Sequence, residues 1–238
     1  MTRTPRTRVR RRTLAFGTAV PAALLMICWV LLGDPLDAMS RAATDAAERT
    51  SPPAAGASAD VSLVDVVVAD AASTSDYERD AFGDAWADVD RNGCDTRNDF
   101  LGRDLVDAVH RNGSACVISR GTLHDPYTGT SIRFVRGERS DRVQIDHVVA
   151  LSYAWRHGAS EWTDDQRRAF ANDPANLLAV DGRTNQQKSD LGPAEWSPPS
   201  AAQVCAYHAG FLAVLAKYDL TIAPADAAAV EAAGCMAG

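Results

Sequence analysis

The sequence has no surplus of positive charge. Its 238 residues contain 24 Lys and Arg against 31 Asp and Glu, a formal net charge of −7. Residues 41–238 hold 18 of the basic residues and 29 of the acidic ones, so this part carries a net charge of −11. Proteins that bind nucleic acid broadly neutralise phosphates with a basic surface. Such a function would here require a local basic patch.

Ligand spacing typical of structural zinc sites is also missing. No two cysteines stand in a C-x-x-C arrangement, which such sites commonly use. The histidines outside the central part of the chain show no ligand-like spacing to one another: they are His110, His124, His157 and His208. Internal repeats are absent as well. A structural zinc site therefore does not explain the cysteines.

The N-terminus has the pattern of an export signal. Six arginines fall within residues 3–12, and an uncharged, largely apolar stretch follows over residues 13–33. Basic residues before an apolar run direct export and stay on the cytoplasmic side. Residues 1–40 are predicted to be a signal peptide or a signal anchor that engages the membrane and export machinery. The protein is then secreted, or held at the outer face of the cytoplasmic membrane.

Beyond Cys28, four cysteines remain in the exported part: Cys94, Cys116, Cys205 and Cys235. An even number of cysteines in an exported chain indicates disulfides. Pairing neighbours, Cys94 with Cys116 and Cys205 with Cys235, is the simplest of three connectivities, and the sequence leaves the other two open. Residues 41–60 are rich in Ala and Pro and predict a flexible linker. One folded domain is expected over residues 61–238.

Apolar periodicity and turn residues predict an α+β domain with few strands and many helices. The hairpin is expected over residues 116–137, with its turn at residues 125–129. Strands are expected at residues 143–149 and 176–180. Helices are expected at residues 76–92, 97–110, 152–156, 163–171, 183–189 and 201–218.

The strand VQIDHVVALS, residues 143–152, carries two ionisable residues, Asp146 and His147. A strand buried on both faces should be apolar throughout, and ionisable groups are rarely buried unless they are paired. The simplest alternative is a histidine satisfied by its own carboxylate neighbour. A functional interpretation depends on what other polar groups reach the same place.

A second polar stretch follows at residues 172–190. Asn176 opens a short apolar strand, and Asn185 and Lys188 lie three residues apart on one face of a helical turn. Two strands followed by a helix could bring Asp146, His147 and Asn185 around one point. Carboxylate and amide oxygens with water suit Mg²⁺, and a neutral imidazole can take a proton from water. Together these groups favour phosphodiester hydrolysis.

These residues resemble the HNH (ββα-metal) endonucleases. The subgroup that is most similar contains the C-terminal domain of GmrSD-type restriction enzymes and small secreted actinobacterial proteins. IDHVVALSYAWRHGA, FANDPANLLAV and NQQKSDLGPAEWSPP resemble successive blocks of that family, so the similarity spans roughly residues 94–218. The fold implied is a helical domain around a hairpin-helix metal core, at about residues 143–190, stabilised by disulfides.

The resemblance also implies roles. Asp146 and Asn185 would hold the metal, His147 would be the general base, and Asn176 would orient it. Lys188 would face a phosphate. Asn185 stands where the family name has its last histidine, which bears on metal affinity.

A local basic patch could supply the phosphate contacts. Arg133, Arg136 and Arg142 lie on the approach to the strand of Asp146, and they are the expected substrate-binding residues. The alternative is a solvated hairpin edge whose charges discourage aggregation. Arg97, beside a cysteine, is expected to make a structural ion pair rather than to contact substrate.

The function expected is an exported, Mg²⁺- or Mn²⁺-dependent endonuclease acting on DNA, with one metal ion per site. An RNA or non-specific nuclease with the same residues is one alternative. A catalytically inactive, envelope-anchored binding module is another, and the charge of −11 is its best support.

Overall fold

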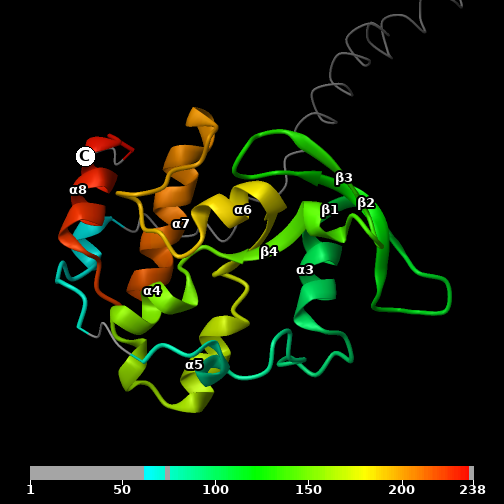
Figure 1. The fold of residues 1–238 in the computed structure, drawn as a ribbon, viewed down its shortest axis with the longest axis horizontal. Coiled ribbons are helices and arrows are strands. Elements are labelled where there is room, and N and C mark those ends of the chain that lie inside the picture. The colour runs from blue at the N-terminus through cyan, green and yellow to red at the C-terminus, as the bar shows by residue number, and fades with distance from the viewer. Residues whose placement is uncertain (1–61, 73–75, 236–238) are drawn as a thin grey trace, which may run out of the picture. The chain divides into compact units, whose positions relative to one another are not determined.

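A computed structural model describes residues 62–72 and 76–235 (Figure 1). The expected signal segment at residues 1–40 and the linker at residues 41–60 lie outside the described residues. Across the described ranges, no helix is long and apolar enough to cross a membrane. The fold is α+β, as expected, with two small sheets.

The first sheet has three antiparallel strands in the order β1-β2-β3. The expected hairpin is confirmed as β2 (Ile118–His124) and β3 (Ser131–Val135). Its turn is closed by Asp125, whose carboxylate accepts hydrogen bonds from the Thr128 backbone and hydroxyl. Edge strand β1 (Leu105–His110) pairs with β2.

Two of the predicted helices are shorter in the structure than expected. The helix expected over residues 97–110 is α3 (Thr96–Asp104), capped by Asp95, and the chain continues as β1. The exposed edge of β2 offers hydrogen bonds to this apolar segment, and tertiary pairing overrides helix propensity. The helix expected over residues 76–92 is only the short 3₁₀-helix η2 (Arg79–Phe82). Gly83 ends it with a φ of 83°.

The second sheet pairs β4 (Val143–His147) with β5 (Leu177–Asp181) in antiparallel register. Helix α6 (Gly182–Lys188) follows β5 directly, with Asp181 as its N-cap. The two strands are joined by α4 (Leu151–Arg156), η4 (Ala159–Glu161) and α5 (Asp164–Ala171), which begins at the predicted cap Thr163. Strand, strand and helix therefore form one unit, and α6 lies beside β4 in Figure 1.

The C-terminal part is helical. It contains η5 (Ala201–Gln203), α7 (Val204–Lys217) and α8 (Pro224–Ala232), while η1 (Leu63–Asp65) and η3 (Ser140–Arg142) lie earlier in the chain. The disulfides are Cys94–Cys116 and Cys205–Cys235, which confirms the simplest pairing. They fix the start of α3 to the β1–β2 turn, and α7 to the end of α8.

The hydrophobic core has two clusters, and β4 connects them. Val143 and Ile145 pack with α3 and the three-stranded sheet, whereas Val148 and Val149 pack with α4 and α7. Figure 1 shows β4 running from the sheet toward the helical layer. Asp146 and His147 therefore occur at the junction of the two clusters.

Candidate functional site

Asp146 and His147 end β4, and their side chains project from opposite faces because strand residues alternate. The Asp146 carboxylate meets Lys188 of α6, whereas the His147 imidazole meets the carbonyl of Ala171 at the end of α5. The expectation that Asp146, His147 and Asn185 surround one point is thus met only in part. The two sides share the end of one strand.

Asp146 is buried and multiply bonded. Its Oδ2 accepts a hydrogen bond from the Tyr127 hydroxyl at 2.7 Å and lies 3.0 Å from Lys188 Nζ. Burial raises the pKa of this carboxyl, while Lys188 and Tyr127 act to lower it. Tyr127 comes from the turn of the β2–β3 hairpin and Lys188 comes from α6. Two separate elements therefore act on the pKa of this carboxyl.

Lys188 does not lie where a phosphate could reach it. Its side chain is fully buried, and Nζ donates to Asp146 and, at 2.8 Å, to the backbone carbonyl of His147. The last turn of α6 is thereby attached to the end of β4. Lys188 was expected to face a phosphate. Its ammonium group instead holds the strand and the helix together.

Asn185 lies one turn before Lys188 on α6, and its Nδ2 donates to Gln144 Oε1 at 3.0 Å. Gln144 and Asp146 share one face of β4, and Asn185 and Lys188 share one face of α6. The pairs Gln144–Asn185 and Asp146–Lys188 therefore lie side by side. Asp146 and Asn185 therefore belong to the same strand-helix contact.

The donor set suits a hard cation. No group of three or more His, Cys, Asp or Glu side chains that could hold a metal occurs in the described ranges. A cation between Asp146 and Asn185 would take one carboxylate, one amide oxygen and otherwise water or phosphate oxygens. Mg²⁺ accepts such a set because it keeps several of its waters. The carboxylate of Asp146 already bonds Tyr127 and Lys188, so a cation there would share it with both of them.

Asn176 ties the chain after β4 to the start of β5. Its Oδ1 accepts from the Val149 backbone N–H at 2.8 Å, and its Nδ2 donates to the Val149 carbonyl at 3.1 Å. Its own carbonyl accepts from the Val148 N–H. The side chain is fully buried. These contacts fix the backbone immediately after His147.

The orientation of the His147 ring follows from its backbone partner. Nε2 lies 2.8 Å from the Ala171 carbonyl, which can only accept, so Nε2 carries the proton in the neutral ring. Nδ1 is then the nitrogen with a free electron pair. Burial lowers the pKa of His147 to about 4, against the effect of the hydrogen bond to Ala171. The imidazole is therefore neutral at physiological pH.

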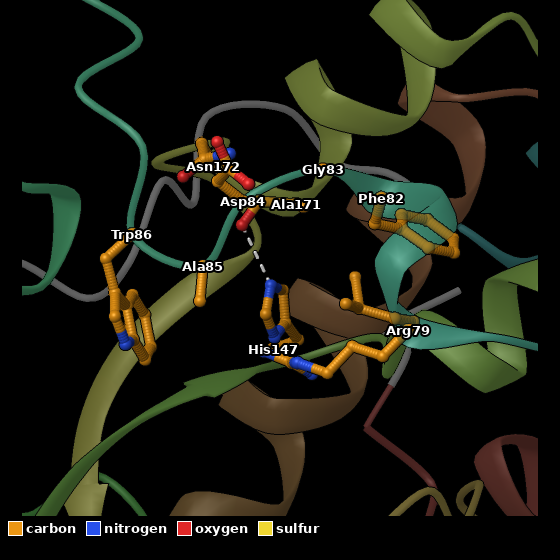
Figure 2. Close-up of a pocket in the computed structure, with 10 residues that line it drawn as sticks. Arg79, Phe82, Gly83, Asp84, Ala85, Trp86, His147, Ala171 and Asn172 are labelled. Atoms are coloured by element: carbon orange, nitrogen blue, oxygen red, sulfur yellow. Dashed lines mark hydrogen bonds between the residues drawn. The ribbon is translucent and has the colours of Figure 1, made fainter.

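His147 lines a pocket between η2, the loop after it and the end of α5 (Figure 2). Arg79 and Phe82 come from η2, Trp86 comes from the following loop, and Asn172 follows α5. Figure 2 shows the Arg79 side chain extending beside the imidazole. The charge of Arg79 acts on His147, as it contributes to lowering its pKa.

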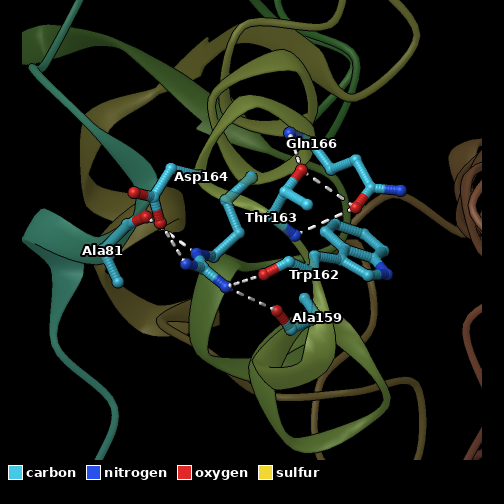
Figure 3. A network of polar contacts seen from close by, with 7 residues as sticks. Ala81, Ala159, Trp162, Thr163, Asp164 and Gln166 are labelled. Atoms are coloured by element: carbon cyan, nitrogen blue, oxygen red, sulfur yellow. Dashed lines mark hydrogen bonds and ion pairs between the residues drawn. The ribbon is translucent and has the colours of Figure 1, made fainter.

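Arg167 of α5 holds the η2 wall in place, and Figure 3 labels its partners Ala81, Trp162 and Asp164. Its Nε donates to the Ala81 carbonyl at 2.9 Å, and its other nitrogens reach the Trp162 carbonyl and the Asp164 carboxylate. Phe82 is buried in the helical cluster on the inner side of η2. The segment that carries Arg79 is thus fixed by a charged contact and by an apolar one.

The three predicted substrate-binding arginines have different surroundings. Arg133 on β3 and Arg142 in η3 are exposed. Arg136 instead bonds within the domain, with Nε 2.6 Å from the Ile118 carbonyl and Nη2 2.6 Å from Asn98 Oδ1. Arg97 is also structural, donating to the Val143 carbonyl at 3.1 Å rather than to a carboxylate.

Sequence reasoning missed Tyr127 and Arg79. Tyr127 lies in a turn whose residues indicate only the hairpin, and its contact with Asp146 spans 19 positions. Arg79 falls in a segment that was expected to be a helix. No local pattern places either residue beside the Asp146–His147 pair, because both positions depend on how the domain folds back on itself.

Comparisons with known proteins identify a family for the chain. A family model described as "GmrSD restriction endonucleases, C-terminal domain" matches residues 95–229, more than half of the chain. An "Uncharacterized secreted protein" of Arthroderma benhamiae is 36% identical over 198 residues, covering 82% of this chain and 93% of that protein. No solved structure matches the chain significantly.

Proposed function

Since the chain belongs to the family of the C-terminal domain of GmrSD restriction endonucleases, a nuclease family, we propose that it is an exported endonuclease that hydrolyses phosphodiester bonds of DNA. The observation that carries this proposal is the state of His147. Its Nε2–H donates a hydrogen bond to the Ala171 carbonyl, which leaves the free electron pair on Nδ1, and the residue lines a pocket together with Arg79.

His147 would act as the general base. A neutral imidazole can accept the proton of a water molecule that attacks phosphorus. Asn176 would keep the base in position, since its side chain fixes the backbone two residues beyond His147. The low pKa of His147 keeps the ring unprotonated before substrate binds.

A divalent metal, Mg²⁺ or Mn²⁺, would be held by Asp146 and Asn185. Bound there, such an ion would supply charge to the leaving oxygen of a diester that lies across the shared end of β4, with His147 acting from the other side. Lys188 would fix Asp146 from behind rather than bind the substrate, because its ammonium is buried against the carboxylate. Tyr127 supports the same carboxylate through its hydroxyl.

Secretion is part of the proposal. The relative from Arthroderma benhamiae bears the name of a secreted protein. The two disulfides of this chain suit an oxidising compartment. Arg133 and Arg142, exposed in β3 and η3, would contribute phosphate contacts on an otherwise acidic domain.

The test is cleavage of plasmid DNA by the oxidised full chain with Mg²⁺, with Mn²⁺ and with a chelator. Nicking that requires the metal is expected, and Asn185→Ala should raise the metal concentration needed for half-maximal cleavage. Equal cleavage in the presence of the chelator would contradict a requirement for metal. No cleavage of DNA by a folded protein would turn the test to RNA, and failure there would favour a binding module.

A further inference from the structure

The site has a base and a place for a metal, but its predicted phosphate-binding cation is buried. Lys188 is fully enclosed and neutralised by Asp146. A phosphodiester that approaches His147 would still need a positive charge, because an anion in a partly buried pocket is unfavourable unless it is paired. The residues lining the pocket must supply it.

We infer that Arg79 binds the scissile phosphate group of the nucleic acid next to His147, an inference that rests on the proposed nuclease function. Arg79 and His147 line one pocket, and Arg79 is its basic residue. A guanidinium presents a planar fork of donors that matches two phosphate oxygens. Figure 2 places this side chain along the imidazole, so a bound phosphate would lie beside the base.

Arg79 is available for a ligand. It is exposed, and no salt bridge joins it to a carboxylate within residues 62–72 and 76–235. The neighbouring Tyr77 shares a side-chain hydrogen bond with Arg79, and burial raises the pKa of its hydroxyl, so this partner is neutral. By contrast, Arg103, Arg156 and Arg167 each pair with an aspartate. A phosphate would not have to displace an existing ionic partner.

The backbone segment that carries Arg79 is also fixed in advance. It begins η2, whose Ala81 carbonyl accepts a hydrogen bond from Arg167, and whose Phe82 side chain is 1% exposed. A charged group on an anchored segment loses little conformational freedom when it binds.

Asp84 lines the same pocket and is exposed. Figure 2 shows it near Ala171 and Asn172, away from Arg79, so its charge would direct the phosphate to the Arg79 side.

The experiment measures binding and cleavage separately in the full oxidised chain. Binding of a short fluorescein-labelled DNA duplex is measured with metal chelated, so that no cleavage occurs. Arg79→Gln should weaken binding about 10- to 100-fold, because a charge-assisted hydrogen bond to phosphate is lost. Arg79→Lys should bind with an affinity between those of the wild type and Arg79→Gln, since lysine keeps the charge but lacks the planar fork of donors. Arg111→Gln, at an exposed arginine after β1, is the matched control and should change binding by less than about twofold.

Cleavage rates then separate this inference from the proposed function. With metal present, Arg79→Gln should lower kcat/KM by a similar factor while its thermal unfolding matches the wild type. If Arg79→Gln binds and cleaves as Arg111→Gln does, the inference is overturned although the nuclease stands. If the wild type cleaves nothing while Arg79→Gln alone weakens binding, the phosphate site stands and the proposed chemistry fails.

Discussion

Lys188 Nζ lies 3.0 Å from Asp146 Oδ2, and the lysine side chain is fully buried. This ion pair joins the last turn of α6 to the end of β4. Removing one partner of a buried pair leaves an uncompensated charge, which is far more costly than losing an exposed pair. The pair therefore supports the strand-helix unit on which the proposed metal site depends.

Lys188→Met should lower the free energy of unfolding by about 3–5 kcal/mol, because Asp146 would remain buried without its cation. Arg156→Met is the control. Arg156 also pairs with an aspartate, but its side chain is 33% exposed and that of its partner Asp190 is 45% exposed, so the cost should stay near or below about 1 kcal/mol. Urea unfolding measures both. The double variant Asp146→Asn with Lys188→Met should lose less than the sum of the single losses, and strict additivity would contradict the pairing.

Asn176→Ala should destabilise the domain by about 2–4 kcal/mol, since it leaves the N–H and the carbonyl of Val149 without their partners in a buried place. Asn112→Ala, at an exposed position in the turn after β1, should change stability by no more than about 0.5 kcal/mol. Chemical denaturation of the two variants makes the comparison. Equal, small effects would show that the Asn176 contacts do not fix this backbone.

Asp173 predicts a pH dependence of stability. Burial acts to raise the pKa of its carboxyl, but hydrogen bonds from Lys217, the Ala175 N–H and Tyr218 lower it overall. A carboxyl whose folded pKa is lowered stabilises the fold above its unfolded pKa, about 3.9. That contribution is lost as the pH falls through the folded value.

Asp173→Asn should therefore cost about 1–3 kcal/mol at neutral pH, and the difference from the wild type should shrink as the pH falls below about 4. Urea unfolding of both proteins across this range measures the difference. A difference that stays constant down to strongly acidic pH would mean that the ionised carboxylate is not the stabilising species.

The strand-strand-helix unit was predictable from the sequence because its signals are local. Apolar runs define β4 and β5, and Asp181 and Gly182 mark the start of α6. The side chain of Lys188 was not predictable in the same way. Its spacing from Asn185 places it on the correct face of the helix, yet only the packing of that face against β4 shows that the face is buried.

The η2 segment shows the opposite case. Tyr77, Phe82 and Trp86 have a spacing that is typical of a helix, but Gly83 ends the turn and Trp86 has a φ of 61°. Phe82 and Trp86 consequently pack in two different clusters. This loop forms a wall of the His147 pocket. The incorrect helix prediction for this segment therefore also hid the proximity of Arg79 to His147.

The most direct test of the account is the single-turnover cleavage rate of His147→Ala beside His110→Ala, an exposed histidine of β1. Both full chains would be oxidised, shown to be folded by thermal unfolding, and supplied with saturating Mg²⁺ and plasmid DNA. Loss of the general base should slow His147→Ala by about 10²- to 10⁴-fold and leave His110→Ala at the wild-type rate. A folded His147→Ala that cleaves as fast as His110→Ala would contradict the assignment of His147 as the base.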